Sequence, residues 1–169
     1  MSRKIKLTRG YYAVVDDVDF ELVNRFTWWA HVYSRGYTYA RHTCNLGKLS
    51  GRQVNGTISM HRLLMRPLIG MEVDHIDHDG LNNRRANLRL CTRSQNAMNR
   101  VSRRNSLSKY KGVTRFTPKG KWIAYITVHG QQINLGGFKD EREAAIEYNK
   151  AAIQYHKEYA HLNDVTINY

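Results

Sequence analysis

Hydrophobic and polar residues alternate in short runs along the first third of the chain. This alternation is typical of β-strands with one buried face. It predicts four strands, at residues 5–7, 13–15, 32–33 and 37–41, and one short helix at residues 16–26. Three glycines among polar neighbours in residues 47–56 predict a loop. Trp28 and Trp29 are adjacent, so we expect only one of them to enter the core.

The pattern changes in the middle of the chain. Residues 58–65 predict a strand running into a short helix, which ends at or before Arg66 because Pro67 disfavours helix in the preceding residue. Strands are predicted at 72–76 and 88–91, and the Asp79-Gly80 pair between them favours a hairpin. Thr92 and Gln95 have the spacing of a capping box, which would begin a helix running to about Arg100.

A second module begins near Ser108. Residues 110–116, 121–129 and 132–138 predict three strands, and a helix begins at Asp140. One stripe of this helix should cover the face of the sheet that carries Trp122, and it contains Ala144, Tyr148, Ala151, Ala152 and Tyr155. The opposite face, with Lys121, Tyr125 and Thr127, would stay open.

These elements predict an α+β chain in four parts. Residues 1–56 form a small β-rich support, and residues 57–101 form a β–β–α segment. Residues 102–108, rich in Ser and Arg and without apolar periodicity, form a basic linker. Residues 109–169 form a three-stranded antiparallel sheet packed on one helix.

Charge points to a polyanionic partner. The chain has 27 Lys and Arg against 14 Asp and Glu, a net charge of +13 and a pI of about 10.0. A generally basic surface is the alternative, but seven arginines and no acidic residue lie between Arg84 and Arg104, which favours a phosphate track on double-stranded DNA. The candidate DNA-binding residues are Arg84, Arg85, Arg93, Arg100, Arg103, Arg104, Lys109, Lys111, Arg115, Lys119, Lys121, Tyr125 and Thr127.

Two cysteines, Cys44 and Cys91, lie far apart without a Cys-x-x-Cys pair. We therefore expect neither zinc nor a disulfide framework. The sequence shows no signal peptide and no apolar run near the length of a membrane span, so we expect an intracellular protein without a membrane partner.

Residues near the predicted hairpin carry candidate chemistry. Asp74 and Asn96 offer hard oxygen ligands, which suit Mg²⁺ or Mn²⁺ rather than zinc. His75 is able to take a proton from water. Because neighbouring residues of a regular strand point to opposite faces, Asp74 and His75 need a bulge or a strand end to serve one site. A metal ion and a base are the minimum equipment for hydrolysing a phosphodiester.

Asp74-His75, Asn87 and Asn96, with His61-Arg62-Leu63 upstream, resemble the HNH family in the form found in phage and intron homing endonucleases. The third letter of the motif is Asn here, which is a common variant. The resemblance implies a ββα-metal nuclease within residues 57–101. In it, His75 activates the water, Asp74 and Asn96 hold one divalent ion, and Asn87 orients the histidine or braces the loop.

His61 has two interpretations. It could be a second metal ligand or base, or a histidine at the edge of the core that is hydrogen-bonded to the hairpin, and the resemblance favours the second.

Five motifs in order resemble the DNA-binding domain of plant ethylene-response factors, the Apetala-two type. They are Tyr110-Lys111-Gly112-Val113, Trp122-x-Ala124-x-Ile126, Leu135-Gly136-x-Phe138, Tyr148-x-x-Ala151-Ala152 and Ala160-x-Leu162-Asn163. The resemblance implies DNA binding. The base-reading arginines of the plant proteins are largely absent, because Tyr125 and Thr127 stand where those proteins carry charged residues.

Together these features predict a metal-dependent endonuclease that cuts duplex DNA to leave 5′-phosphate and 3′-hydroxyl ends, targeted by its C-terminal domain. The resemblance implies the cytoplasm of a bacterial or phage-infected host. A monomer without an obligate protein partner is expected, with a dimer as the alternative. A rival function is a non-catalytic DNA-binding regulator with a degenerate HNH scaffold. A third possibility is an RNA-binding protein, which rests only on charge and aromatic residues.

Overall fold

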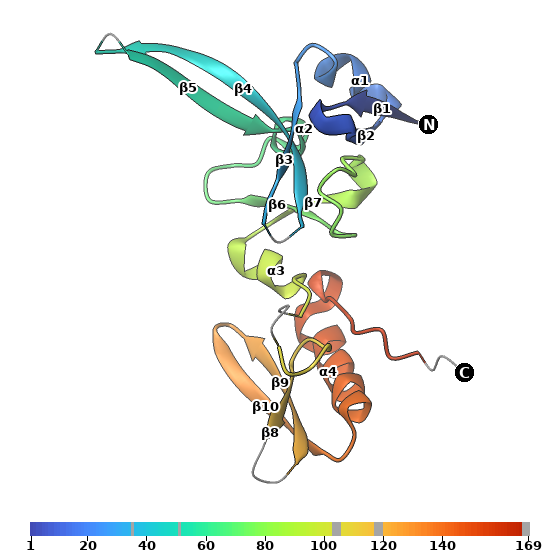
Figure 1. The fold of residues 1–169 in the computed structure, drawn as a ribbon. Coiled ribbons are helices and arrows are strands. Elements are labelled where there is room, and N and C mark those ends of the chain that lie inside the picture. The colour runs from blue at the N-terminus through green and yellow to red at the C-terminus, as the bar shows by residue number, and fades with distance from the viewer. Residues whose placement is uncertain (35, 51, 103–105, 117–119, 167–169) are drawn as a thin grey trace. The chain divides into compact units, whose positions relative to one another are not determined.

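The computed structural model describes residues 1–34, 36–50, 52–102, 106–116 and 120–166. They form two compact units, Met1–Thr92 and Arg93–Tyr169, and each is described here by itself (Figure 1). Each unit contains helices and a sheet, so the mixed α+β class is confirmed. The four-part division and the metal-centred arrangement stay predictions. No helix in these residues is long and apolar enough to cross a membrane.

The first unit begins with a two-stranded antiparallel sheet, β1 (Ser2–Lys6) and β2 (Tyr12–Asp16), joined by the 3-10 helix η1 (Thr8–Gly10). The short helix α1 (Asp17–Val23) follows, with Asp17 and Asp19 in its first turn, where negative charge favours the helix dipole. These elements confirm the first two predicted strands and the predicted helix.

A second antiparallel sheet has the order β3 (Trp29–Val32), β4 (Thr38–Leu49) and β5 (Arg52–Ser59). The β4–β5 hairpin is the longest ladder of this unit and extends past its other elements (Figure 1). The predicted loop at 47–56 is therefore wrong, because pairing continues to Leu49 and Arg52. Gly47, with φ of 96°, lies at a register shift between Asn45 and Lys48. A bulged strand exposed on both faces shows no alternation, so its sequence looks like a loop.

The helix α2 (Met60–Met65) ends at Arg66, which has a left-handed φ of 45° just before Pro67. Strands β6 (Glu72–His75) and β7 (Leu88–Cys91) then pair in antiparallel fashion, as predicted. Their connection runs from Ile76 to Asn87 and includes the 3-10 helix η2 (Arg85–Asn87), so the Asp79-Gly80 pair lies inside a long loop. We call residues 72–91 the β6–β7 motif.

One core joins this motif to the N-terminal sheets. Val15, Trp28, Met60 and Leu88 are buried in the same cluster. Trp28 is 3% exposed whereas Trp29 is half-buried, so the expectation that one tryptophan enters the core is confirmed. The loop of the motif is hydrogen-bonded to β2, where the backbone N–H of Asn83 donates to the carbonyl oxygen of Val14 at 2.7 Å. The N-terminal sheets and the β6–β7 motif therefore fold as one body.

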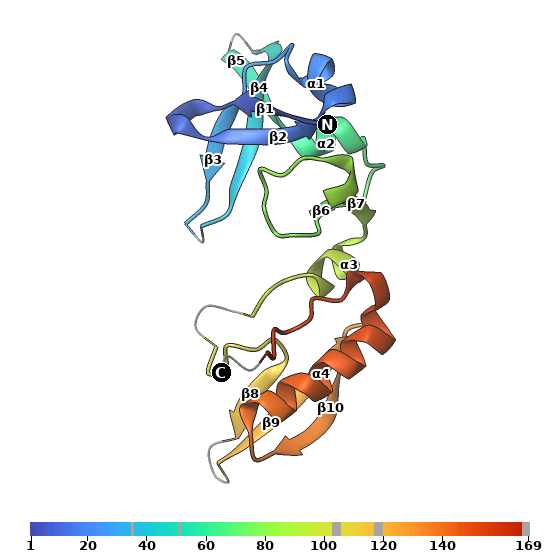
Figure 2. The same ribbon diagram turned by 90° about the vertical axis from the view of Figure 1, so that its right-hand side faces the viewer.

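The second unit begins with α3 (Arg93–Met98), near the predicted helix. Its sheet has the order β10 (Gln131–Phe138), β9 (Lys121–Val128) and β8 (Val113–Phe116), all antiparallel. Helix α4 (Glu141–His156) lies along one face of this sheet (Figure 2), and the short 3-10 helix η4 (Lys157–Tyr159) follows it. The Asp140 carboxylate accepts the backbone N–H groups of Arg142 and Glu143, which confirms the predicted start of the helix.

The buried stripe of α4 differs from the prediction at one end. Ala144, Tyr148, Ala151 and Ala152 are buried as expected, but Tyr155 is 42% exposed. His156 is buried instead, and its Nε2 donates to the carbonyl oxygen of Thr127 at 2.9 Å. The last turn thus contacts the sheet through His156, which takes the place expected of Tyr155. The predicted packing of the helix on the Trp122 face is confirmed.

Candidate active site

The strand β6 carries Asp74 and His75, which are 7% and 6% exposed. Asp74 pairs with Arg89 and His75 with Leu88 on β7. His75 is the last residue of β6, so the strand end that the sequence required is present. Both side chains are removed from bulk water, and the loop that connects β6 to β7 begins directly after His75.

Asp74 is held by an ion pair with Arg89. The guanidinium donates from Nε at 2.9 Å and from a terminal nitrogen at 2.7 Å, and both contacts reach the same oxygen, Oδ2. The two side chains are 15% and 8% exposed, so solvent screens this pair poorly. Arg89 therefore serves the motif itself and is not available to a phosphate track.

His75 is kept neutral by its surroundings. Burial lowers the pKa of this imidazole, and the side chain of Asn83 and the carboxylates of Asp77, Asp74 and Asp79 oppose that shift only in part. A neutral imidazole can accept a proton at pH 7, which is the property needed in a general base.

Asn87 braces the loop of the motif. Its Oδ1 accepts the backbone N–H of Asp77 at 3.1 Å, and its Nδ2 donates to Asp77 Oδ1 and to the carbonyl oxygen of Asn82, both at 2.8 Å. Burial alone would raise the pKa of Asp77, but hydrogen bonds from Asn82, Asp79 and Asn87 lower it. Of the two roles implied for Asn87, these contacts support bracing the loop.

The sequence missed Tyr39, Asn83 and Arg89 as residues of this site, whereas it had already singled out His61. Tyr39 of β4 and His61 of α2 pack their rings against His75, and the buried side chain of Asn83 lies beside it. Arg89 was expected to contact DNA. Only Asn83 and Arg89 had a usable signal, since they lie within the motif. Tyr39 comes from a strand more than thirty positions upstream, and its alternation pattern indicated only a strand.

The favoured interpretation of His61 needs correction. A hydrogen bond to the hairpin was expected, but His61 Nδ1 is buried and has no hydrogen-bond partner among the described residues. His61 contacts the hairpin through its ring instead, because α2 lays the imidazole edge-on against His75.

Asn96 lies on α3 and therefore in the second unit, whereas Asp74 lies in the first. The pairing of these two side chains around one ion stays a prediction. Within the part of the chain that the structure describes, no group of three or more His, Cys, Asp and Glu side chains could hold a metal ion.

The arginines expected to contact DNA have different environments. Arg85 donates from Nε and a terminal nitrogen to the buried carboxylate of Asp19 at 2.8 and 2.7 Å, so it ties α1 to the motif. Arg84 Nε donates to Asn82 Oδ1 at 2.9 Å on the surface. Arg93 and Arg100 are exposed. Arg103, Arg104 and Lys119 lie outside the described residues.

In the second unit, the sheet face turned away from α4 is open. The register places Tyr125 beside Asn134 and Thr114 beside Ile123 on this face. A shallow hollow of about 350 Å³ lies there, lined by Thr114, Ile123, Tyr125, Gln132 and Asn134. Lys121 and Thr127 are exposed on the same face. This open polar face is the candidate nucleic-acid interface.

Two predicted contacts lie elsewhere in the second unit. Arg115 pairs with Trp122, and its guanidinium lies 5.7 Å from the indole centroid. Lys111 is partly buried, with its Nζ bonded to the carbonyl oxygen of Met98, and burial followed by the charge of Arg100 lowers its pKa to about 8. Lys111 therefore stabilises this unit. Its ammonium group is half-buried, so it is poorly placed to contact DNA.

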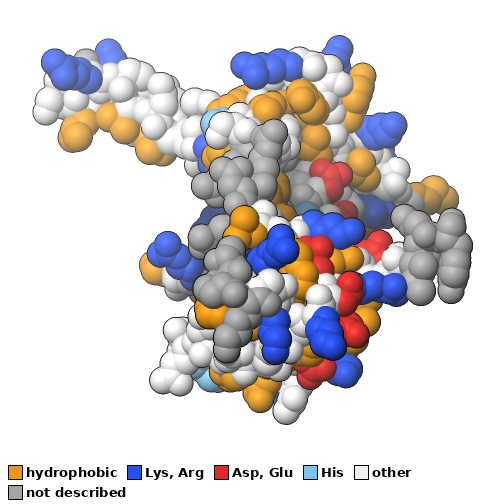
Figure 3. Space-filling view, turned by 60° about the horizontal axis from the view of Figure 1, so that its bottom comes forward, with side chains coloured by type: hydrophobic (Ala, Val, Ile, Leu, Met, Phe, Trp, Pro, Cys, Tyr) orange, Lys and Arg blue, Asp and Glu red, His pale blue; other side chains and the backbone are white. Residues whose placement is uncertain are grey.

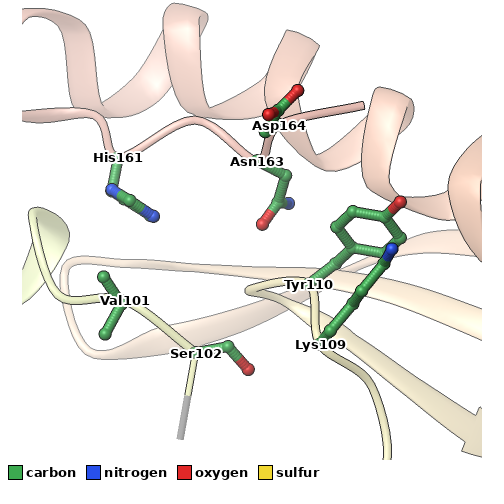
Figure 4. Close-up of a pocket in the computed structure, with 7 residues that line it drawn as sticks. All are labelled: Val101, Ser102, Lys109, Tyr110, His161, Asn163 and Asp164. Carbon is green, nitrogen blue, oxygen red and sulfur yellow. The ribbon is translucent and has the colours of Figure 1, made fainter. Parts of the chain in front are cut away.

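A second hollow of about 370 Å³ lies between the segment before β8 and the segment after α4 (Figure 4). Its lining residues are Val101, Ser102, Lys109, Tyr110, His161, Asn163 and Asp164. Asn163 exchanges two hydrogen bonds with the backbone of Lys111, and the ammonium of Lys109 lies 4.9 Å from the Tyr110 ring centroid. The Asn163 bonds fasten the C-terminal segment to the segment before β8, so this hollow is part of how the fold is held together.

Charge is unevenly distributed. Figure 3 shows Lys and Arg side chains at the tip of the β4–β5 hairpin and, mixed with Asp and Glu, over part of the second unit. The Asp and Glu residues of the second unit begin at Asp140, after its sheet, because none occurs between Gly80 and Lys139. The whole open sheet therefore lacks acidic side chains that would repel a phosphate backbone.

Two parts of the chain are similar to known proteins. Residues 67–98 match the family model of the HNH endonucleases. The chain is 28% identical over 166 residues to an uncharacterized HNH endonuclease, L560, of Acanthamoeba polyphaga mimivirus, covering 93% of this chain and 77% of that protein.

The C-terminal part is similar to plant transcription factors. It is 36% identical over 66 residues to the AP2-like ethylene-responsive transcription factor TOE2 of Arabidopsis thaliana, which is 39% of this chain and 14% of that protein. It is 38% identical over 60 residues to APETALA2-like protein 2 of Oryza sativa subsp. indica, which is 36% of this chain and 14% of that protein. The chain thus spans only about a seventh of these plant relatives.

Proposed function

We propose that this protein is a metal-dependent endonuclease of the homing type, which hydrolyses phosphodiester bonds in double-stranded DNA and is targeted by its second unit. One observation carries the proposal. A buried, neutral His75 stands beside Asp74 at the end of β6, inside the segment that matches HNH endonucleases. Proton acceptor and hard anionic ligand are thereby held on adjacent residues of one rigid element.

The donor set fits a hard divalent ion. Asp74 and Asn96 would hold it through oxygen atoms, and Arg89 fixes the Asp74 carboxylate through two hydrogen bonds to Oδ2. Mg²⁺ and Mn²⁺ accept one or two protein oxygens together with water and substrate phosphate. When bound, such an ion supplies Lewis acidity and neutralises charge on the phosphate.

His75 acts on the water. It takes a proton as the water oxygen bonds to phosphorus, and the bond from phosphorus to the 3′ oxygen breaks. The leaving 3′ oxygen takes a proton from solvent water, which gives 5′-phosphate and 3′-hydroxyl ends. General-base catalysis of this kind contributes about 10² to 10⁴ in rate. Asn87, by bracing the loop through Asp77 and Asn82, keeps the end of β6 in place.

The second unit supplies DNA affinity. Its open sheet face carries hydrogen-bonding side chains, an exposed Lys121 and no acidic residue. A small antiparallel sheet of this kind can enter the major groove. Similarity to plant AP2-like factors supports the same role.

A plasmid-nicking assay tests the proposal. Cleavage of supercoiled DNA should require Mg²⁺ or Mn²⁺ and stop in EDTA. Asp74→Asn keeps an acceptor for Arg89 but weakens the ligand, so it should lose cleavage and Mn²⁺ affinity measured by calorimetry. Asp17→Asn, at an exposed carboxylate that pairs with Arg3, is the matched control and should cleave normally. Tight DNA binding without cleavage under any divalent ion would instead support a non-catalytic regulator.

A further inference from the structure

The ring of Tyr39 lies against the β6–β7 motif although Tyr39 belongs to β4. Its centroid is 5.7 Å from that of His75, 5.6 Å from that of His61 and 5.8 Å from that of Tyr33. These separations fall in the range in which tilted and edge-to-face ring pairs attract each other. Tyr39 therefore contacts the proposed base from a strand that the sequence assigned to a support.

His61 completes the ring cluster from α2. Its centroid is 4.9 Å from that of His75, with an angle of 83° between the ring planes. Three rings from three separate elements, Tyr39, His61 and His75, thus meet pairwise. His61 Nδ1 has no hydrogen-bond partner among the described residues. His61 therefore contacts His75 by ring packing and not through a hydrogen bond from Nδ1.

Gly80 shows how closely β4 and the loop of the motif approach. A Cβ atom at Gly80 would lie 2.4 Å from the carbonyl oxygen of Thr38 and 2.7 Å from two ring carbons of Tyr39. Only glycine fits at such a distance. The loop between β6 and β7 therefore rests directly on the Tyr39 ring, which is packed between that loop and the two imidazoles.

Charge favours this packing. Burial, followed by the neighbouring His75, lowers the pKa of His61 to about 3, so its ring is neutral at physiological pH. Burial, followed by Tyr33, Tyr37 and Asp74, raises the pKa of Tyr39, so its hydroxyl stays protonated. Neutral rings can stay in contact with His75, whereas a charged imidazolium beside it would draw in water.

We propose that Tyr39 and His61 are positioning residues, which hold the imidazole of His75 in the orientation from which it takes the proton of the attacking water. This inference rests on the function proposed above. Neither side chain touches the reacting atoms in this role. Each acts by closing off the other orientations that the His75 ring could adopt at the end of a strand.

Kinetics provide the first test. Single-turnover cleavage, with protein in excess over DNA, separates the maximal rate from the protein concentration at half-saturation. Tyr39→Leu and His61→Leu should lower the maximal rate by roughly 10²-fold, the loss that a small misplacement of a reacting group causes. The half-saturation concentration should stay within about twofold, because these rings act on the base and not on DNA affinity.

Matched variants separate positioning from general damage. Tyr39→Phe and His61→Phe keep a ring and should retain most of the rate. Tyr12→Leu, the same change at an exposed tyrosine of β2, should cleave like the wild type. A Tyr39→Leu protein that cleaves at the wild-type rate, or a Tyr39→Phe protein as slow as Tyr39→Leu, would overturn the assignment.

Nuclear magnetic resonance gives a second readout that does not need cleavage. The ring C–H signals of His75 should shift in Tyr39→Leu, which removes a ring current, and stay near their wild-type positions in Tyr39→Phe. Unshifted His75 signals in Tyr39→Leu overturn the inference. If the wild type proves unable to cut DNA, the proposed function fails, yet this spectrum still decides whether the Tyr39 ring packs against His75.

Discussion

The β6–β7 motif of the first unit and the open sheet of the second unit are both small antiparallel ladders, but they treat polar groups in opposite ways. The motif buries Asp74, His75 and Asn87, and it pairs Asp74 and Asn87 with other side chains of its own. The sheet leaves Lys121 and Thr127 exposed and Tyr125 half-buried. Acidic residues gather in the motif and are absent from Gly80 to Lys139.

This contrast follows from what each region has to do. Proton transfer and metal binding need groups held in one geometry, and removal from water strengthens the electrostatic contacts that hold them. Recognition of a polyanion needs accessible donors and no repelling charge. The comparison predicts that variants in the motif change the rate of cleavage, whereas variants on the sheet change affinity.

The largest effect is expected at the proposed base. His75→Ala should slow cleavage by about 10² to 10⁴, because a general base is lost, while DNA affinity stays unchanged. Single-turnover kinetics and a filter-binding titration measure the two quantities. An unchanged rate would exclude His75 as the base. A loss of DNA affinity together with the rate would show that the β6–β7 motif also contributes to DNA binding, against the contrast between the motif and the sheet.

A glycine pair tests the stability of the second unit. Gly112 has a φ of 73°, and a Cβ there would lie 2.1 Å from the Tyr148 ring and 2.6 Å from the carbonyl oxygen of Tyr125. Gly112→Ala should therefore destabilise this unit by about 3 kcal/mol. Gly130, with a φ of 80° and no neighbour within 4 Å, is the control, and Gly130→Ala should cost about 1 kcal/mol.

Urea unfolding, followed by hydrogen exchange of β9 amides, measures both glycine variants. DNA affinity should fall with the Gly112→Ala protein while the β6–β7 amides remain protected. Equal destabilisation by the two variants would show that the close approach to Tyr148 is not what fixes Gly112.

The pH dependence of stability should report the buried histidines of the first unit. Burial lowers the pKa of His61 to about 3 and also lowers that of His75, whereas both would titrate near 6.5 in the unfolded chain. Below about pH 6.5 the unfolded state therefore binds more protons than the folded state. The free energy of unfolding should fall as pH decreases, by at most about 1.4 kcal/mol per pH unit for each histidine.

Urea titrations of the first unit's signals at pH 7.5 and 5.5 check this expectation. His61→Phe removes one of the two groups, so its stability should change less between these pH values than that of the wild type. Equal changes in the two proteins would mean that His61 is not held neutral by the fold.

The smallest effect is expected on the open sheet. Lys121→Ala should weaken DNA binding by less than about tenfold and reduce the slope of log affinity against log salt by about 1, without changing the maximal cleavage rate. Lys150→Ala is the control, because Lys150 lies on α4 and pairs with Glu147 at 3.0 Å. An identical salt slope for both variants would place the interface elsewhere.

The sequence by itself determined the local order of the elements and the residues of the motif. Periodicity located β6, β7 and the sheet of the second unit, and Asp140 marked the start of α4, because side-chain alternation and capping act over a few residues. It also placed Asp74 beside His75. The sequence did not predict the β4–β5 ladder, because the bulge at Gly47 breaks the alternation. It also did not predict the exposure of Tyr155, which depends on how the last turn of α4 packs against β9.

Only the tertiary structure decided which distant side chains serve the site. Arg89 and Arg85 read as two members of one arginine track, yet one holds Asp74 and the other holds Asp19. Tyr39 reaches His75 because β4 packs on Gly80. Such partners are chosen by burial, since a charge or ring removed from water must find its contact wherever the packed chain provides one, and no spacing along the sequence encodes that choice.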